Sequence, residues 1–404
     1  MTARPDDVTV WIGLDVGKEE HFADVLDNAG ERLFARSLRN DESDVTAVID
    51  RADKHGTPAL VIDQPGSIAQ LAIAVAVARG VPVAYIPGLV MRRAADLYPG
   101  EAKTDRRDAF VIANTARIHA RQIHWLDTTS DTALEELRVL NGYDIDLAAD
   151  VNKTTNRLRD ALTAISPALE RVLGQRLHQA GPRLLLAKWA TPTSLRAAGR
   201  GKVTKLLTTT MPRVGERVAA EVFAALDTQT LTLPAERVLG QVIVEIAGEL
   251  ERLYQRRERL AVQIEEVFRS HPFGEVLLSM PGIGPRTGAR ILAEIGHPDR
   301  FATGDKLAAY AGLAPVTRQS GKSISGETKS RRGNHRLKNA MFIAAFASLR
   351  SPDSKAFYER KRAEGKKHNA AIVCLARRRC DVILAMLRTG QHYHSTPPSR
   401  QEAA

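Results

Sequence analysis

The chain has 404 residues, of which 44% are hydrophobic and 26% charged, and this balance excludes a disordered polyelectrolyte. Its length exceeds that of one ordinary hydrophobic core, so we expect at least two domains. The net charge is +11 and is unevenly placed, because residues 315–380 hold 17 lysines and arginines against 4 acids, a surplus of +13. This local surplus predicts a polyanionic partner.

Cysteine usage and hydropathy indicate a cytoplasmic location. Cys374 and Cys380 are the only cysteines, and their spacing, without a flanking histidine pair, matches neither a zinc site nor a disulfide framework. The N-terminal residues lack the pattern of a secretion signal, and the longest apolar stretch, around Ile68 to Ala78, is interrupted by Gln70. We therefore expect reduced thiols and no membrane-spanning segment.

The first 125 residues alternate between strand-like and helix-like patterns, which is typical of an α/β domain with helices covering a mixed sheet. Strands are expected over 8–17, 21–30 and 31–40, because short apolar runs flank a turn-forming Asn and Gly. The elements expected next are a helix at 41–55, a strand at 58–63, a helix at 67–79, a strand at 81–86, a helix through Arg93 and a helix at 104–120. This order, βββαβαβα, is that of the ribonuclease-H-like fold.

Long helical patterns follow over 131–165 and 237–267. In the second stretch, apolar residues recur at alternating steps of three and four positions, and Arg257 fills the one seam position that is not apolar. The pattern predicts a coiled-coil-like arm within a domain spanning 126–271, with a bend between 181 and 215 where Pro and Gly are frequent. A hairpin within one chain and a coil between two chains are equally compatible with this spacing.

The segment 272–389 is predicted to be a mainly helical domain, and residues 390–404 a disordered tail. Near its start, LLSMPGIGPRTGARILAEIG predicts a helix-hairpin-helix. Gly282 and Gly284 in its turn would let backbone N–H groups approach a phosphate at a helix N-terminus, which gives a grip on nucleic acid without sequence preference. The alternative is a structural turn that uses glycine only for its dihedral freedom.

Four acids follow strand ends or begin a helix in the first domain: Asp15, Asp63, Asp105 and Asp108. Carboxylates that converge repel one another unless a cation neutralises them, so the pattern predicts a site for Mg²⁺, or Mn²⁺, that serves phosphodiester cleavage or exchange. Alternatively, Asp105 and Asp108 are first-turn acids that complement the helix dipole, and the other two only solvate strand ends.

A loop over 318–333 places several hydroxyl groups among cations. Its serines are Ser320, Ser323, Ser325 and Ser330, and the basic residues in and just after it are Arg318, Lys322, Lys329, Arg331, Arg332 and Arg336. A serine here can attack phosphorus and conserve the bond energy in a phosphoserine-linked DNA end, and guanidinium groups would offset the charge of the transition state. From residue types alone, such a loop is more often a flexible phosphate-binding segment than the site of a nucleophile, and spacing alone selects no one serine.

Taken together, GLDVGK, KTDRRDA, MPGIGPRTGARILAEIG, and GLAPVTRQSG followed by RRGNHRLKNA resemble the DEDD transposases of the IS110 group of insertion sequences. The similarity spans roughly residues 8–385. It implies a RuvC-like N-terminal domain with the tetrad Asp15, Asp63, Asp105 and Asp108, and a C-terminal transposase domain with Ser320 as the catalytic serine. The second acid of the family pattern is usually Glu, so Asp63 departs from it and must sit closer to its metal.

The resemblance also implies partners. These are donor and target DNA, a bridge-type guide RNA from the element's own ends, and protein dimers that assemble into a tetramer, in a cytoplasmic, nucleoid-associated setting. The leading hypothesis is a recombinase that excises and inserts a mobile element through a covalent serine–DNA intermediate. Two alternatives are a metal-dependent nuclease specific for DNA structures such as junctions, in which the serine loop only binds phosphate, and a non-catalytic nucleic-acid scaffold.

Overall fold

The computed structural model describes residues 7–64, 67–98, 104–121, 123–126, 131–320, 324–328, 330 and 332–395. For residues 316–320 and 324–328, and for Ser67 and Leu89, it describes the backbone alone. The chain divides into two compact units, Met1–Ser130 and Asp131–Ala404. The predicted boundary between 271 and 272 has no counterpart in this division, since the arm and the C-terminal region share one unit.

The first unit is a sheet with strand order β3-β2-β1-β4-β5-β6. Its strands are β1 (Val10–Asp15), β2 (Glu20–Asp27), β3 (Arg32–Arg39), β4 (Pro58–Ile62), β5 (Val83–Tyr85) and β6 (His124–Trp125). β1 runs antiparallel to β2 and parallel to β4. The predicted order of elements is confirmed; the two-residue β6 was not foreseen, because two residues carry no periodicity.

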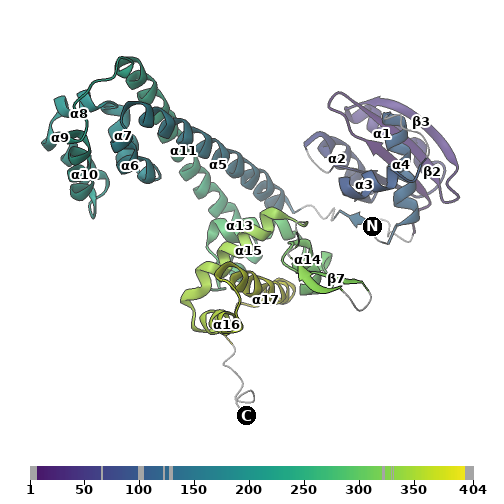
Figure 1. Ribbon diagram of the computed structural model, residues 1–404. Helices are drawn as coiled ribbons and strands as arrows, with labels where there is room; N and C mark the ends of the chain where they lie inside the picture. The colour runs from purple at the N-terminus through teal and green to yellow at the C-terminus, as the bar shows by residue number, and fades with distance from the viewer. Residues whose placement is uncertain are drawn as a thin grey trace, which may run out of the picture. The chain divides into compact units, whose positions relative to one another are not determined.

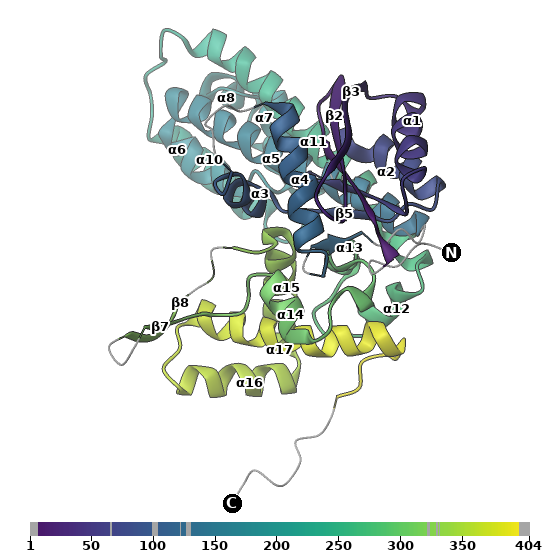
Figure 2. The same cartoon turned by 90° about the vertical axis from the view of Figure 1, so that its right-hand side faces the viewer.

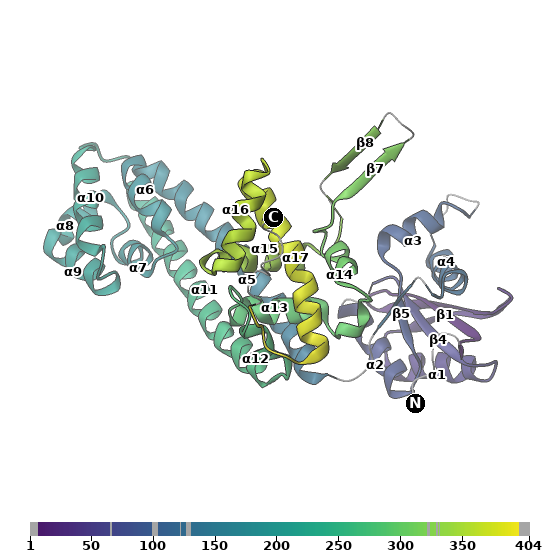
Figure 3. The ribbon, with the colours of Figure 1, turned by 90° about the horizontal axis from the view of Figure 1, so that it is seen from below.

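Helices cover both faces of this sheet, as Figure 3 shows. They are α1 (Glu42–Asp53), α2 (Gln70–Ala78), α3 (Gly88–Ala95) and α4 (Asp105–Ile118). Side chains alternate along each strand: Val10, Ile12 and Leu14 pack with α1 and α2, whereas Trp11 packs in a second core with α3 and α4. β1 is therefore buried on both faces, which explains its almost continuous apolar sequence.

In the second unit, two long helices, α5 (Thr132–Ile165) and α11 (Glu236–Ser270), pack side by side within the chain (Figure 1). The segment between them forms α6 (Pro167–Leu173), α7 (Ala180–Lys188), α8 (Pro192–Ala198), α9 (Arg200–Thr210) and α10 (Gly215–Asp227). The predicted bend at 181–215 is thus a set of short helices, because their Pro and Gly residues lie at helix boundaries as well as in turns. Pairing of this arm between chains stays a prediction.

The rest of the second unit surrounds one end of these long helices (Figures 1 and 2). It comprises α12 (Phe273–Leu278), α13 (Pro285–Ile295), α14 (Gly304–Tyr310), α15 (His335–Ala347), α16 (Pro352–Ala363) and α17 (His368–Thr389). An antiparallel hairpin of β7 (Val316–Ser320) and β8 (Ile324–Thr328) stands where the sequence predicted a loop. Residues 396–404 of the predicted tail lie outside the described residues.

A buried carboxylate joins α5, α11 and α13. Asp144 is 3% exposed and accepts from Arg257 Nε at 3.0 Å, Arg290 Nη2 at 3.2 Å and Arg286 Nη2 at 3.5 Å. Arg257, the polar residue in the apolar seam, is therefore present to pair with Asp144 on the facing helix. A buried charge is tolerated only when it is paired and hydrogen-bonded in this way.

No helix in the described part of the chain is long and apolar enough to cross a membrane, in agreement with the hydropathy of the sequence.

We expect Asp144→Asn to destabilise the second unit, because three guanidinium groups would lose their shared anion. The arginines retain partial solvent contact, so the loss should be about 1–3 kcal/mol, below that of a fully buried pair. Urea unfolding followed by circular dichroism measures it. Asp146→Asn, an exposed change on the same helix, is the matched control, and equal stability of the two variants would contradict the assignment.

Candidate active site

The ends of two neighbouring strands bring Asp15 and Asp63 together. β1 and β4 are parallel and in register up to Leu14 and Ile62, and the two aspartates are the next residues on each strand. By strand alternation both carboxylates belong to the face that Trp11 and Val61 share with α4. The structure therefore places the first two predicted acids at one end of the sheet and on one face.

A glycine in β1 brings α4 onto this end of the sheet. A Cβ on Gly13 would overlap the carbonyl oxygen of Ala109 and would lie 2.5 Å from the nitrogen of Ala113. Only glycine permits this approach between strand and helix backbones, a role of strand glycines that the sequence analysis missed although VWIGLD carries the signal. Asp108 directly precedes Ala109 and is half-buried.

Asp105, in contrast, is exposed in the first turn of α4. The helix is capped by the Thr104 hydroxyl, which accepts from the Arg107 N–H at 3.3 Å. Asp105 therefore fits the helix-dipole interpretation as well as the metal-ligand one, and its place in the tetrad stays a prediction.

The surroundings of Asp63 destabilise the ionised form of its carboxyl group. Its Oδ1 is buried without a hydrogen-bond partner among the described residues. Burial raises the pKa of Asp63 above its ordinary value, and the nearby Asp108 carboxylate raises that pKa further, against a hydrogen bond from Gln64. A half-buried acid whose ionised form is destabilised in this way is a candidate functional group.

These acids offer the donors that a hard divalent cation prefers, since carboxylate oxygens are the usual ligands of Mg²⁺. The orphaned Oδ1 of Asp63 and the repulsion from Asp108 are both conditions that a bound cation would relieve. Among the residues that the structure describes, however, no three acidic, histidine or cysteine side chains lie close enough to enclose a metal ion. The donor chemistry fits a cation, whereas a closed ligand shell is not formed.

A buried histidine holds the turn after Asp15 in place through a hydrogen bond. His21 is 2% exposed, and its Nδ1 accepts from the Gly17 N–H at 3.2 Å. Burial lowers the pKa of His21, so the ring is held neutral and its Nδ1 is available as an acceptor. The sequence analysis did not identify His21, because a single histidine in a strand gives no pattern.

The predicted serine site falls on the β7–β8 hairpin of the second unit. Ser320 is the last residue of β7 and pairs with Ile324, while Arg318 and Ser325 also belong to the hairpin. The side chains of these residues lie outside the described part, and so do Lys322, Ser323, Lys329 and Arg331. Their roles stay predictions.

The backbone packs closely where the chain enters and leaves the β7–β8 hairpin, a region that we call the base of the hairpin. Gly312 and Gly333 both have positive φ, and a Cβ on Gly333 would lie 2.6 Å from the Gly312 nitrogen. Asn334 then closes the base: its Oδ1 caps α15, and its Nδ2 donates to Glu294 at 2.6 Å and to the Tyr310 hydroxyl at 3.0 Å.

Side chains at this base also include predicted binding residues. Arg332 and Arg336 are exposed beside it. The Ser330 hydroxyl, by contrast, forms a local turn, since it accepts from the Arg332 N–H at 3.2 Å.

The predicted helix-hairpin-helix corresponds to α12, a turn and α13. Gly282 has φ +82°, and a Cβ there would meet Ser348 N at 2.5 Å, so its missing side chain lets the turn pack against the end of α15. Gly284, at the start of α13, has open space around its Cβ position. Packing explains Gly282; phosphate binding by this turn stays a prediction.

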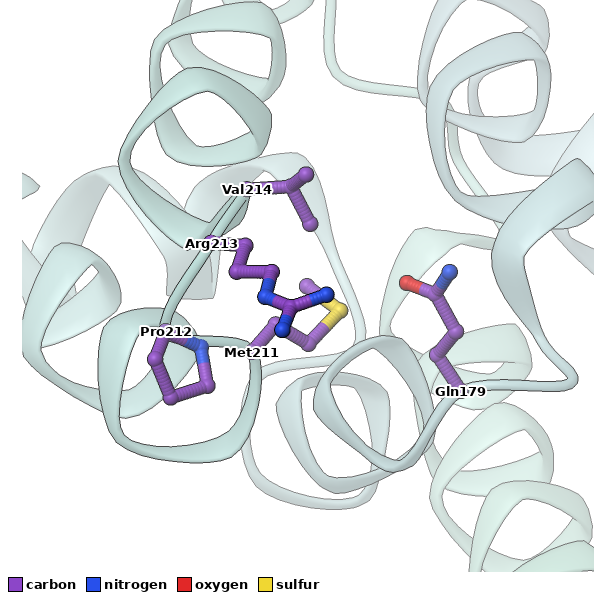
Figure 4. A pocket seen from close by; sticks show the side chains of 5 residues that line it. All are labelled: Gln179, Met211, Pro212, Arg213 and Val214. Carbon is purple, nitrogen blue, oxygen red and sulfur yellow. The ribbon is translucent and has the colours of Figure 1, made fainter.

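A shallow hollow of about 340 Å³ lies elsewhere in the second unit, between α7 and the α9–α10 connection (Figure 4). Gln179, Met211, Pro212, Arg213 and Val214 line it. The lining offers no acid or nucleophile, so the hollow does not compete with the two sites described above.

Comparison with known proteins identifies relatives along the chain. The DEDD transposase model of IS110, described as "Transposase", matches residues 12–167, and the model described as "Transposase IS116/IS110/IS902 family" matches residues 274–359. The IS110 43.6 kDa protein of Streptomyces coelicolor is 45% identical over 99% of both chains. The IS116 44.8 kDa protein of Streptomyces clavuligerus is 37% identical over 100% of both.

Two further similarities cover less of the chain. A "Pilin gene-inverting protein" of Moraxella bovis is 32% identical over 29% of this chain and 38% of that protein. The structure of T. thermophilus RuvC with a Holliday junction substrate matches 29% of this chain and 99% of its own, with 16% identity and a TM-score of 0.24.

We expect Gly13→Ala to displace α4, because the added methyl group would meet backbone atoms that cannot rotate away. A shift of Asp108 by about 1 Å relative to the strand ends should lower DNA cleavage on the order of 100-fold. Gly88→Ala is the matched control, since its Cβ would meet nothing within 4 Å. Cleavage of element-end DNA by both variants checks the prediction, which fails if Gly13→Ala keeps wild-type activity.

We expect Asp63→Asn to raise the stability of the protein and to abolish its DNA cleavage. Because the pKa of Asp63 is raised in the folded state, the ionised carboxylate destabilises the fold. This destabilisation is complete at pH values above the folded-state pKa and absent at pH values below the ordinary value of 3.8. The amide should therefore stabilise the protein at pH 7 by on the order of 1 kcal/mol while cleavage is lost. This gain should shrink as the pH falls toward 3.8.

Asp24→Asn is the control for this experiment. Asp24 is fully buried, whereas Asp63 is half-buried, and Arg32 Nε donates to both Asp24 oxygens at 2.9 Å, so the amide variant of Asp24 should lose stability. Added MgCl2 should stabilise the wild type more than Asp63→Asn, because ligand binding to the folded state adds to its stability. Destabilisation by both amide variants at pH 7 would show that Asp63 is a structural acid.

Proposed function

Because this chain belongs to the IS110 family of transposases, enzymes that cleave and rejoin DNA, we propose that it excises and inserts an insertion sequence through a metal-dependent carboxylate site and a covalent serine–DNA intermediate. One observation carries the proposal. Asp15 and Asp63 end neighbouring parallel strands beneath α4, and the buried Oδ1 of Asp63 has no partner among the described residues.

The carboxylates supply the first half of the proposed chemistry. Asp15, Asp63 and Asp108, with Asp105 at the helix start, would hold Mg²⁺ or Mn²⁺. Bound there, such an ion neutralises charge that develops on a scissile phosphate. The shorter Asp63, in place of the usual Glu, must approach the ion more closely, and its position directly after β4 on the face of α4 supports this role.

Ser320 supplies the second half. Its hydroxyl oxygen would attack phosphorus, so that an Oγ–P bond forms as the bond from phosphorus to the neighbouring deoxyribose oxygen breaks. The serine hydroxyl gives up its proton on attack, and the departing oxygen takes up a proton in balance and leaves as a hydroxyl group. The reverse attack by another DNA hydroxyl rejoins the strand. Conservation of the phosphoester bond makes a nucleotide cofactor unnecessary. The position of Ser320 at the end of a hairpin with a tightly packed base supports this role.

The remaining proposals concern partners. The surplus of +13 over 315–380 suits donor and target DNA together with a bridge-type RNA. The turn at Gly282 and Gly284, and the exposed Arg332 and Arg336, would contact the phosphate backbone. The arm of α5 and α11 would contribute a coiled coil to a homodimer that assembles into a tetramer, in a cytoplasmic, nucleoid-associated setting.

We expect Ser320→Ala to abolish covalent attachment to DNA. The wild type is incubated with nicked element-end DNA and MgCl2, the denatured complex is digested with protease, and the peptide that carries the nucleotide is identified by mass spectrometry. Ser330→Ala is the matched control, because the Ser330 hydroxyl is engaged with the backbone of Arg332, and it should form the adduct normally.

The outcomes separate three functions. Loss of adduct and of element circularisation in Ser320→Ala, with loss of both in Asp15→Ala, supports the recombinase. Cutting by Ser320→Ala without an adduct would instead identify a metal-dependent nuclease. Unchanged DNA reactions in Asp15→Ala and Asp105→Ala would leave only a binding scaffold. Repeating the assay with and without RNA from the element's ends tests the guide.

A further inference from the structure

An aromatic and basic surface lies at the far end of α15 from the hairpin. Phe346 is 54% exposed, and its ring packs edge-on against His368 with centroids 6.2 Å apart. Tyr358 packs edge-on against the same histidine at 5.7 Å. These three rings come from α15, α16 and α17, which lie together in Figure 3. We call Phe346, Tyr358 and His368, with the cations described next, the aromatic platform.

Positive charge borders the platform. Arg350, Lys366 and Lys367 are exposed, and each lies within four residues of Phe346 or His368 in the sequence. Within the described residues these three cations form no ion pair, whereas Lys361 nearby is paired with Glu364 at 2.7 Å. The surface thus combines an exposed flat ring with exposed cations, of which Lys366 also acts at longer range on the Glu364 carboxylate. An exposed ring beside cations is the combination by which proteins hold unpaired bases and their phosphates.

We infer that the aromatic platform binds unpaired single-stranded DNA, with a base stacked on Phe346 and phosphates beside Arg350, Lys366 and Lys367. The inference rests on the proposed function, since cutting and exchanging strands exposes unpaired DNA. It adds to that function a binding site made of residues other than the four acids and Ser320.

Two other occupants fit less well. A docked protein would use the apolar area of Phe346 and the neighbouring Ile343, which is 44% exposed, but lysines are depleted from the centres of protein interfaces. RNA would be distinguished through its 2′-hydroxyl group. The ring of Phe346 has no polar atom for that contact, and the Tyr358 hydroxyl already bonds His368 Nδ1 at 2.7 Å.

The test is binding of the full-length protein to fluorescein-labelled oligothymidylate, measured by anisotropy in EDTA so that no cleavage occurs. Phe346→Ala should weaken binding by roughly 5- to 100-fold. Phe346→Leu should weaken it similarly, because leucine keeps the apolar area and loses the flat ring, and Phe346→Trp should retain it. Val262→Ala is the control, since Val262 is equally exposed at 54% on α11 and should bind normally. Thermal unfolding confirms that each variant folds.

Several results would overturn the inference. Retained affinity in Phe346→Leu would indicate apolar docking of a protein, and unchanged affinity in Phe346→Ala would remove the site. A loss confined to an oligouridylate of equal length would assign the platform to RNA. The proposed function is tested independently of the platform. If Ser320→Ala still cuts DNA while Phe346→Ala binds oligothymidylate weakly, the serine mechanism is contradicted and the aromatic platform is supported.

Discussion

The backbone contact between Gly13 and α4 is the constraint on which the acidic site depends. The absent side chain lets Ala109 and Ala113 of the helix lie directly against the centre of β1. The parallel register of β1 and β4 then sets two carboxylates at the strand ends, and α4 brings Asp108 near enough to raise the pKa of Asp63. Like charges are thereby held together at a cost in folding free energy, which is the arrangement expected when a cation is part of the working state. Among the described residues, no three acidic, histidine or cysteine side chains lie close enough to enclose an ion.

Two fully buried acids of this chain are paired with arginine side chains, whereas Asp63 is half-buried. Asp24 is enclosed by Arg32, and Asp144 is enclosed by three arginines from two helices. Glu236, which is 4% exposed, is held differently: its Oε1 accepts from the Thr193 N–H at 3.2 Å, while its Oε2 has no partner among the described residues. Asp63 Oδ1 likewise has no partner in the described part of the structure. What distinguishes Asp63 is the nearby Asp108 carboxylate, which raises the pKa of Asp63 further, and its role as a metal ligand stays a prediction.

Sequence patterns predicted those parts of the fold that residues close together in the chain determine. Strand-like and helix-like apolar patterns located the elements of the first unit and both long helices, and the position of acids at the ends of apolar strands pointed to Asp15 and Asp63. The pairing of Asp144 with three arginines could not be predicted, because these arginines lie 113 to 146 residues away from Asp144 in the sequence. The β7–β8 hairpin was missed because Gly, Ser and Lys in VTRQSGKSISGETK favour a loop unless pairing across the turn outweighs their preference.

The second unit links its two proposed DNA-contacting regions through one rigid element. α15 begins at the base of the hairpin, where Asn334 caps it, and its other end carries Phe346. Ten residues of helix separate Arg336 from Phe346, which corresponds to about 15 Å at 1.5 Å per residue. A strand held on the aromatic platform would therefore stand at a fixed distance from the base of the Ser320 hairpin. Because Gly312, Gly333 and Asn334 pack that base tightly, the distance is set by the fold and requires no additional contact with the DNA.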